Sequence, residues 1–262
     1  MYTRSAFYLQ IILVFFLFSP FVSYALNVVP FSGELDLNKQ SSYKFHVSNP
    51  KQRESAVKIS VQQWEFDENG VETRKPSNDL IVFPKRMLLE PKGERSVRVS
   101  FRPKNVPLQE KAYRIIVEEV PIRDKQRLRH SKGSLITVLT RYVTAFYVKP
   151  HNALSNIKVL ESNLLDNGFS LRIRNEGNAH THFIQPSLTI HQADKKLIIN
   201  ELDLLDSFAS TNIFALGLRS YHWEIPENFR DTLDFSQPYK VLLDWTCENC
   251  TSQKDQISFI VD

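Results

Sequence analysis

The chain has 262 residues, 42% of them hydrophobic, and a formal net charge of +4 at pH 7. That apolar content is enough for packed cores, which excludes general disorder, and so small a positive surplus gives no reason to expect a nucleic-acid partner. The sequence contains no GxSxG, HExxH, phosphate-loop or GxGxxG pattern. We therefore expect no enzyme activity, no cofactor and no small-molecule substrate.

Residues 1–25 have the pattern of a secretory signal peptide. A single basic residue, Arg4, precedes an apolar run over residues 6–18, and Ser23 and Ala25 place small residues at the positions that a signal peptidase reads. A membrane anchor is the alternative, but the run is short for a span of about 20 residues. We expect export across the inner membrane and cleavage near Ala25.

The first half of the mature chain reads as a series of short strands. Apolar and polar residues alternate in segments closed by turn residues, and Asn69-Gly70 is suited to a hairpin because both residues tolerate positive φ. The predicted strands are residues 43–47, 57–64, 80–83, 96–101, 113–120 and 135–148. These six segments come close to the number of strands in one immunoglobulin-like sandwich, which has about seven.

After residue 148 the same pattern begins again. Pro150 follows Lys149 and is expected to end the strand pairing, so the boundary between two domains is placed here. Further strands are predicted at residues 169–173, 187–191, 195–199, 219–225, 240–245 and 256–261, while residues 202–208 fit a short helix or a strand. We predict an all-β protein with two immunoglobulin-like domains, residues 26–148 and 151–262, whose cores include Trp64, Trp223 and Trp245.

The two cysteines, Cys247 and Cys250, lie three residues apart. In an exported protein, the simplest interpretation of such a pair is a disulfide, with a redox dithiol or half of a zinc site as alternatives. A redox thiol needs a helix N-terminus, whereas both flanking segments read as strands. His180 and His182 could share a metal on one face of a strand, but no third ligand is evident, and we expect no metal site.

Three segments of the chain resemble the PapD-like periplasmic chaperones of pilus assembly. They are LIVFPKRMLLEPKGERSVRVSF from residue 80, AYRIIVEEVP from residue 112 and GSLITVLTRYVTAFYVKP from residue 133. The resemblance is best over residues 26–150, and the sequence near Asp79 and Arg141 is closest to that of the archaic, Csu-type branch. The resemblance implies a boomerang of two domains that holds pilin subunits in the periplasm and delivers them to an outer-membrane usher. It leaves open a self-capping homodimer when no subunit is bound.

Residues 135–148 resemble the strand that these chaperones lend to a subunit. Donor-strand binding pairs the backbone of such a strand with an incomplete sandwich, while alternate side chains fill its groove. One face of this segment carries Ile136 and Val138, and the other carries Leu135 and Leu139. Alignment on Pro150 favours Ile136 and Val138 as plugs, with Thr140 as a third, although the residues alone leave open which face is donated. The alternative is an ordinary core strand that is buried on both sides.

The chain departs from the family at the anchor for the subunit carboxylate. Family members use an Arg on the first strand and a Lys on the seventh, but residues 26–38 contain no basic residue and Ala145 stands near the position of the Lys. A carboxylate shielded from water needs a charge-assisted donor. The candidates to replace the missing pair are Arg141 first, then Arg114 and Arg98. The resemblance also implies that Lys149 helps to fix the angle between the domains, with Asp234 as its partner.

A structural or adhesive component of a secreted surface fibre is the alternative function. Such a subunit is expected to carry its own donor extension, an alternating apolar tail before its first sandwich. Residues 26–31 are too short to fill a groove. The sequence therefore favours the chaperone.

Overall fold

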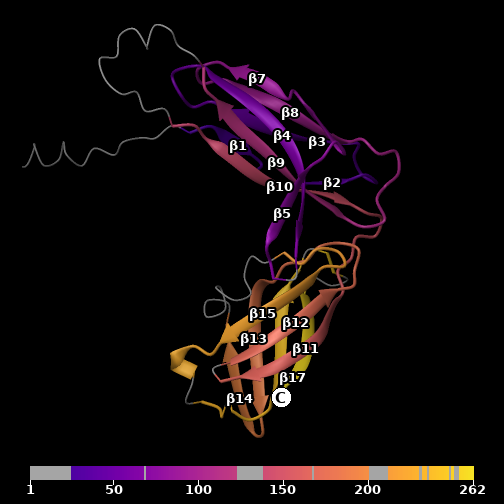
Figure 1. The fold of residues 1–262 in the computed structure, drawn as a ribbon, viewed down its shortest axis with the longest axis vertical. Coiled ribbons are helices and arrows are strands. Elements are labelled where there is room, and N and C mark those ends of the chain that lie inside the picture. Colours follow the sequence, from indigo (N-terminus) through magenta and orange to yellow (C-terminus); the bar gives the residue numbers. More distant parts are fainter. Residues whose placement is uncertain are drawn as a thin grey trace, which may run out of the picture.

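The computed structural model describes residues 25–67, 69–122, 138–166, 168–200, 212–229, 232–234, 236–247, 249–250 and 254–262. Figure 1 shows two β-domains that meet at an angle, one containing β1–β10 and the other β11–β17. Apart from the 3-10 turn η2 (Glu227–Phe229), the described segments form strands and connections. Nothing helical in these segments has the length and apolar character needed to cross a bilayer. The predicted all-β class with two immunoglobulin-like domains is confirmed.

The N-terminal domain is a sandwich of two sheets. In chain order its strands are β1 (Asn27–Val29), β2 (Gly33–Asp36), β3 (Ser42–Ser48), β4 (Ser55–Phe66), β5 (Glu72–Pro76), β6 (Leu80–Phe83), β7 (Arg86–Leu89), β8 (Glu94–Phe101), β9 (Lys111–Val120) and β10 (Arg141–Lys149). One sheet has the order β1-β3-β8-β6, and the other has the order β2-β10-β9-β4-β5 with β7 also paired to β4.

The alternating residues of these strands form the core between the two sheets. Val57 and Ile59 of β4 meet Val97 and Val99 of β8 in one buried cluster, to which β9 and β10 also contribute. Burying a side chain of this size stabilises the fold by roughly 1.5–3 kcal/mol. The β4–β5 hairpin turns at Gly70, whose positive φ of 84° suits glycine.

The C-terminal domain repeats the sandwich with seven strands among its described residues. They are β11 (Ile157–Leu165), β12 (Gly168–Asn175), β13 (Ile184–Gln192), β14 (Lys195–Ile199), β15 (Leu218–Glu224), β16 (Tyr239–Thr246) and β17 (Lys254–Val261), arranged as β11-β12-β15 and β14-β13-β16-β17. Trp223 and Trp245 lie in its core, as predicted. Cys247 and Cys250 form a disulfide, which confirms the preferred interpretation of that pair.

The strand predictions need correction at several places. The short strands β1, β2, β5 and β7 were not among the predicted strands. β11 was not predicted, because a register shift between Val159 and Glu161 interrupts its alternation and most of its side chains are exposed or half-exposed. The strand predicted to begin at residue 135 has its described start at Arg141, after residues 138–140 that are not in a strand. Leu135 and Ile136, the predicted signal peptide up to residue 24, and residues 202–208 lie outside the described residues.

Candidate functional site

One edge of β10 is only half covered. β9 pairs with β10 from Arg141 to Val148, whereas β2 pairs with the opposite edge only from Phe146 to Lys149. β1, which precedes β2, belongs to the other sheet, where it pairs with β3. Residues 141–145, the open half of β10, therefore have no strand partner on that edge within the part of the chain that the structure describes. An uncovered edge presents backbone groups that another strand can pair with.

The segment that leads into the open half of β10 carries exposed apolar side chains. Val138 is 77% exposed and Leu139 is 42% exposed, and Thr140 immediately precedes the strand. Within β10 itself, Phe146 and Val148 pack into the core. An open edge and exposed apolar residues thus adjoin, and together they provide backbone pairing groups and side chains to fill a groove.

A half-buried arginine lies next to Ala145 on the outer face of this sheet. Arg114 of β9 lies directly opposite Ala145, and its guanidinium is 3.5 Å from the centre of the Trp64 ring. Its Nε and Nη2 donate to the two carboxylate oxygens of Glu72, at 3.1 and 2.9 Å. Burial works to raise the pKa of the Glu72 carboxyl, but hydrogen bonds from Arg114 and Arg74 outweigh it and hold that pKa below its usual range.

The other two anchor candidates are placed differently. Arg141 lies on the same sheet as Arg114, is 57% exposed, and its Nε is 4.0 Å from Glu118 Oε2. Arg98 is exposed on β8 of the opposite sheet, where its register partners are Lys44 and Phe83. The structure thus brings two of the three predicted cations to the sheet that contains β10 and leaves Arg98 apart from them.

Tyr147 and Lys149 in the closed half of β10, residues 146–149, contact the C-terminal domain. Tyr147 stacks on His180 with ring centres 4.0 Å apart, and its hydroxyl accepts a hydrogen bond from Asn212 at 2.8 Å. His180 Nδ1 is in turn 2.6 Å from Oε1 of Glu110, and both side chains are buried. Burial, followed by the charge of Glu110, raises the pKa of the Tyr147 hydroxyl. Tyr147 therefore joins the two domains as a neutral side chain.

Aromatic residues at the end of β4 extend this interface. Trp64 meets Phe214 of the C-terminal domain with ring centres 4.8 Å apart. The guanidinium of Arg219 lies 4.0 Å from the centre of the Phe66 ring and donates to the backbone oxygen of Asp67 at 2.9 Å. The prediction that Trp64 belongs to a domain core is wrong, because its ring projects from the outer face of its sheet into the contact between domains.

Lys149 also reaches the C-terminal domain, but not through Asp234. Its Nζ is 2.6 Å from Glu34 Oε2 and donates to Asn249 Oδ1 at 3.1 Å. Asn249, which is buried inside the loop closed by the disulfide, donates through Nδ2 to the backbone oxygen of His180 at 2.9 Å. Asp234 lies in the turn before β16, where its carboxylate accepts hydrogen bonds from Ser236. The predicted pairing of Lys149 with Asp234 is therefore replaced by contacts to Glu34 and Asn249.

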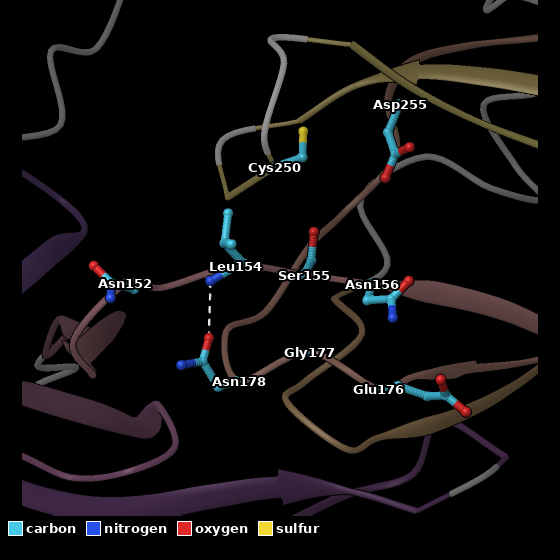
Figure 2. A pocket seen from close by; sticks show the side chains of 9 residues that line it. All are labelled: Asn152, Leu154, Ser155, Asn156, Glu176, Gly177, Asn178, Cys250 and Asp255. Carbon is cyan, nitrogen blue, oxygen red and sulfur yellow. Dashed lines mark hydrogen bonds between the residues drawn. The ribbon is translucent and has the colours of Figure 1, made fainter.

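A polar pocket of about 530 Å³ lies beside this joint. Figure 2 shows its lining residues, which are Asn152, Leu154, Ser155, Asn156, Glu176, Gly177, Asn178, Cys250 and Asp255. A hydrogen bond from the Leu154 amide to Asn178 Oδ1 spans its wall at 2.8 Å. Ligand atoms of Cys247, Cys250 and Asp255 lie within 4.8 Å of one another. The two sulfurs are joined in the disulfide, so they are not available as thiolate ligands for a metal.

Several residues at the domain contact were not selected from the sequence. Glu110, Asn249, Arg219 and Phe214 carry no local pattern that distinguishes them from ordinary loop and strand residues. His180 was selected, but as a metal ligand candidate, whereas the structure pairs it with Glu110. For Asn249, the one sequence feature that could have indicated a structural role was its place between Cys247 and Cys250, in a short disulfide loop.

Comparison with known proteins agrees with this architecture. Residues 36–153 match the family model described as "Pili and flagellar-assembly chaperone, PapD N-terminal domain". No curated protein matches the sequence. The solved structure of the class 5 fimbriae chaperone CfaA has 14% sequence identity and a TM-score of 0.59, with 90% of this chain and 99% of that chain covered.

Two structures of complexes are also similar. A chain from the chaperone–tip adhesin complex of CFA/I fimbriae biogenesis has 15% identity and a TM-score of 0.58, with 90% of this chain and 98% of that chain covered. A chain from the CsuC–CsuE pre-assembly complex of the archaic Csu pili of Acinetobacter baumannii has 12% identity and a TM-score of 0.55, with the same coverage of 90% and 98%.

The N-terminal domain is thus similar to the PapD N-terminal domain family, and the two-domain fold is similar to that of solved fimbrial chaperones. The archaic branch is not distinguished from the others, because the Csu chain and the CfaA chain are matched to a similar degree.

Proposed function

We propose that this protein is a periplasmic chaperone that binds pilin-type subunits by donor-strand complementation and delivers them to an outer-membrane usher. The observation that carries the proposal is the open half of β10, which continues directly from exposed Val138 and Leu139. The signal peptide pattern of residues 1–25 and the periplasmic location of this chaperone family support export.

The physical problem that such a chaperone solves is an incomplete sandwich. A subunit that lacks one strand exposes an apolar groove and an unpaired edge, both of which promote aggregation. In the proposed complex the backbone of residues 141–145 pairs with that edge. The donor side chains are Ile136 and Val138, with Thr140 as a third, and Leu135 and Leu139 lie on the alternate face. Each apolar side chain that enters the groove stabilises the complex by roughly 1.5–3 kcal/mol.

The carboxylate anchor belongs to the same proposal. Arg141 is the first candidate, because it lies beside the open edge and its contact with Glu118 is long, at 4.0 Å. Arg114 is the second, since it occupies the neighbourhood of Ala145 where family members place a Lys. A subunit carboxylate there competes with Glu72 for the guanidinium of Arg114. In the absence of a subunit, the open edge can pair with a second copy of the chain.

The decisive experiment is co-expression with the small secreted proteins encoded beside its gene, followed by pull-down. Replacing both Ile136 and Val138 by Asp places charges in the proposed donor face, which should abolish co-purification while the chaperone stays folded. The matched control replaces Ile198 and Ile260, two exposed residues of the C-terminal domain, by Asp. Equal recovery of the subunit with both double variants would show that the proposed plugs are wrong.

A further inference from the structure

A buried ion pair lies at the end of the N-terminal domain where β10 begins. Lys51 Nζ is 2.6 Å from both carboxylate oxygens of Glu119, and the two side chains are only 10% and 5% exposed. Desolvation makes such a pair a weak source of net stability, and apolar residues of similar volume often replace it without loss. Net stability is therefore a weak reason for the presence of this ion pair.

Neighbouring residues hold the pair in one geometry. Ser55 Oγ donates to Glu119 Oε1 at 3.0 Å, and the Lys51 amide donates to Asn49 Oδ1 at 3.2 Å. The side-chain amide of Asn49 donates in turn to the backbone oxygens of Arg53 and Glu90. The carboxylate is thus fixed by the connection between β3 and β4 as well as by its own strand.

The same carboxylate reaches the residue that precedes β10. The Glu119 amide donates to the Thr140 oxygen at 2.8 Å, and the Thr140 amide faces Glu119 Oε2 at 3.4 Å. Both backbone groups of Thr140 are therefore engaged by one residue of β9. Val138, two residues earlier, is 77% exposed. The contact between Glu119 and Thr140 therefore lies where the exposed segment with Val138 and Leu139 enters the sheet.

We propose that Glu119, held by Lys51 and Ser55, is a positioning residue that fixes the direction in which Val138 and Leu139 are presented to a partner strand. The inference rests on the proposed function and adds a residue to it. Ordering a flexible backbone opposes binding through lost conformational entropy, so a segment whose exit from the sheet is already fixed binds with a smaller entropic loss. A carboxylate suits this role because it accepts several hydrogen bonds at once.

A matched pair of double variants tests the proposal. Lys51→Met with Glu119→Gln, and Lys51→Met with Glu119→Leu, both remove the two charges, so neither leaves a buried charge unpaired. Glutamine keeps an oxygen that accepts from Thr140 and Ser55, whereas leucine of similar volume does not. The difference between the two variants therefore isolates the acceptor from the charge.

The readout is the hydrogen exchange rate of the Thr140 amide, measured by NMR, together with the mobility of a spin label attached at Val138→Cys. We expect exchange at least about tenfold faster, and a more mobile label, in the leucine variant than in the glutamine variant at matched thermal stability. Equal exchange and equal mobility would overturn the positioning role. If the leucine variant does not fold, Ser55→Ala provides the test: unchanged Thr140 exchange contradicts the proposal and faster exchange supports it.

Subunit capture separates this inference from the proposed function. With the neighbouring secreted proteins as probes, the leucine variant should recover several-fold less subunit than the glutamine variant. Equal recovery by the two variants overturns the positioning role and leaves the chaperone function standing. If the unaltered chain captures none of them, the proposed function is contradicted, and the exchange rates of Thr140 still decide whether Glu119 positions the segment.

Discussion

The two halves of β10 belong to one continuous strand but have different surroundings. Residues 146–148 are paired on both edges, and Tyr147 among them is covered by the C-terminal domain. Residues 141–145 are paired only with β9 on the described part of the chain. The comparison teaches that one strand can anchor a domain joint with one end and offer a free edge with the other.

Matched valine substitutions give the largest expected difference between the two halves. Val148 is fully buried in the closed half, so Val148→Ala should lower the free energy of unfolding by about 2–4 kcal/mol through lost burial and a residual cavity. Val143 is half-buried in the open half, and Val143→Ala should lower it by less than about 1 kcal/mol. Urea unfolding followed by tryptophan fluorescence measures both, and similar losses would mean that the open half is covered.

The domain joint beside the closed half is expected to give the next effect. Asn249→Ala removes the acceptor for Lys149 and the donor to His180, and it leaves buried groups without partners. We expect a loss of roughly 1–3 kcal/mol and a wider distribution of interdomain distances. Double electron–electron resonance between labels on the two domains measures the distribution. The exposed Asn163→Ala serves as the control, and an unchanged distribution in Asn249→Ala would contradict the joint.

Acidification should lower the folding stability of the N-terminal domain, in which Glu119 lies beside the open half of β10. Burial works to raise the pKa of Glu119, but hydrogen bonds from Lys51 and Ser55 outweigh it, and the folded-state pKa is lowered. A lowered carboxyl pKa contributes stability that is present above the unfolded value of about 4.3 and is lost as the pH falls through the folded value.

Unfolding free energies measured between pH 7 and pH 3 test whether stability is lost as the pH falls. The unaltered protein should lose more stability on acidification than the variant carrying Lys51→Met with Glu119→Gln, because that variant has no carboxylate to protonate at this position. Parallel pH profiles for the two proteins would rule out the contribution of Glu119.

The smallest effect on stability is expected in the open half itself. Arg141→Ala removes an exposed side chain whose contact with Glu118 is long, at 4.0 Å, so the free energy of unfolding should change by no more than about 0.5 kcal/mol. Recovery of a co-expressed subunit should nevertheless fall if Arg141 anchors its carboxylate. Lys158→Ala, an exposed cation on β11, is the control, and equal recovery by the two variants would remove the anchor assignment.

The local pattern of this sequence was sufficient for most of the strands and for the fold class. Period-two alternation indicated most strands, the spacing of Cys247 and Cys250 indicated their disulfide, and family-like segments indicated the chaperone fold. It missed the short strands β1, β2, β5 and β7, and it missed β11, where a register shift and exposed side chains obscure the alternation. Period two shows that a strand has two faces, but it contains no information on what covers each of them.

The tertiary structure alone decided which residues meet. Trp64 and Phe214 are 150 positions apart in the printed sequence yet touch at the domain contact, and Glu119 reaches back to Lys51 and forward to Thr140. Such contacts depend on strand register and on how two sandwiches are oriented, and both are settled by packing over the whole chain rather than by neighbouring residues. The same reason explains why Lys149 pairs with Glu34 and Asn249, and why Arg98 lies on the opposite sheet from Arg141.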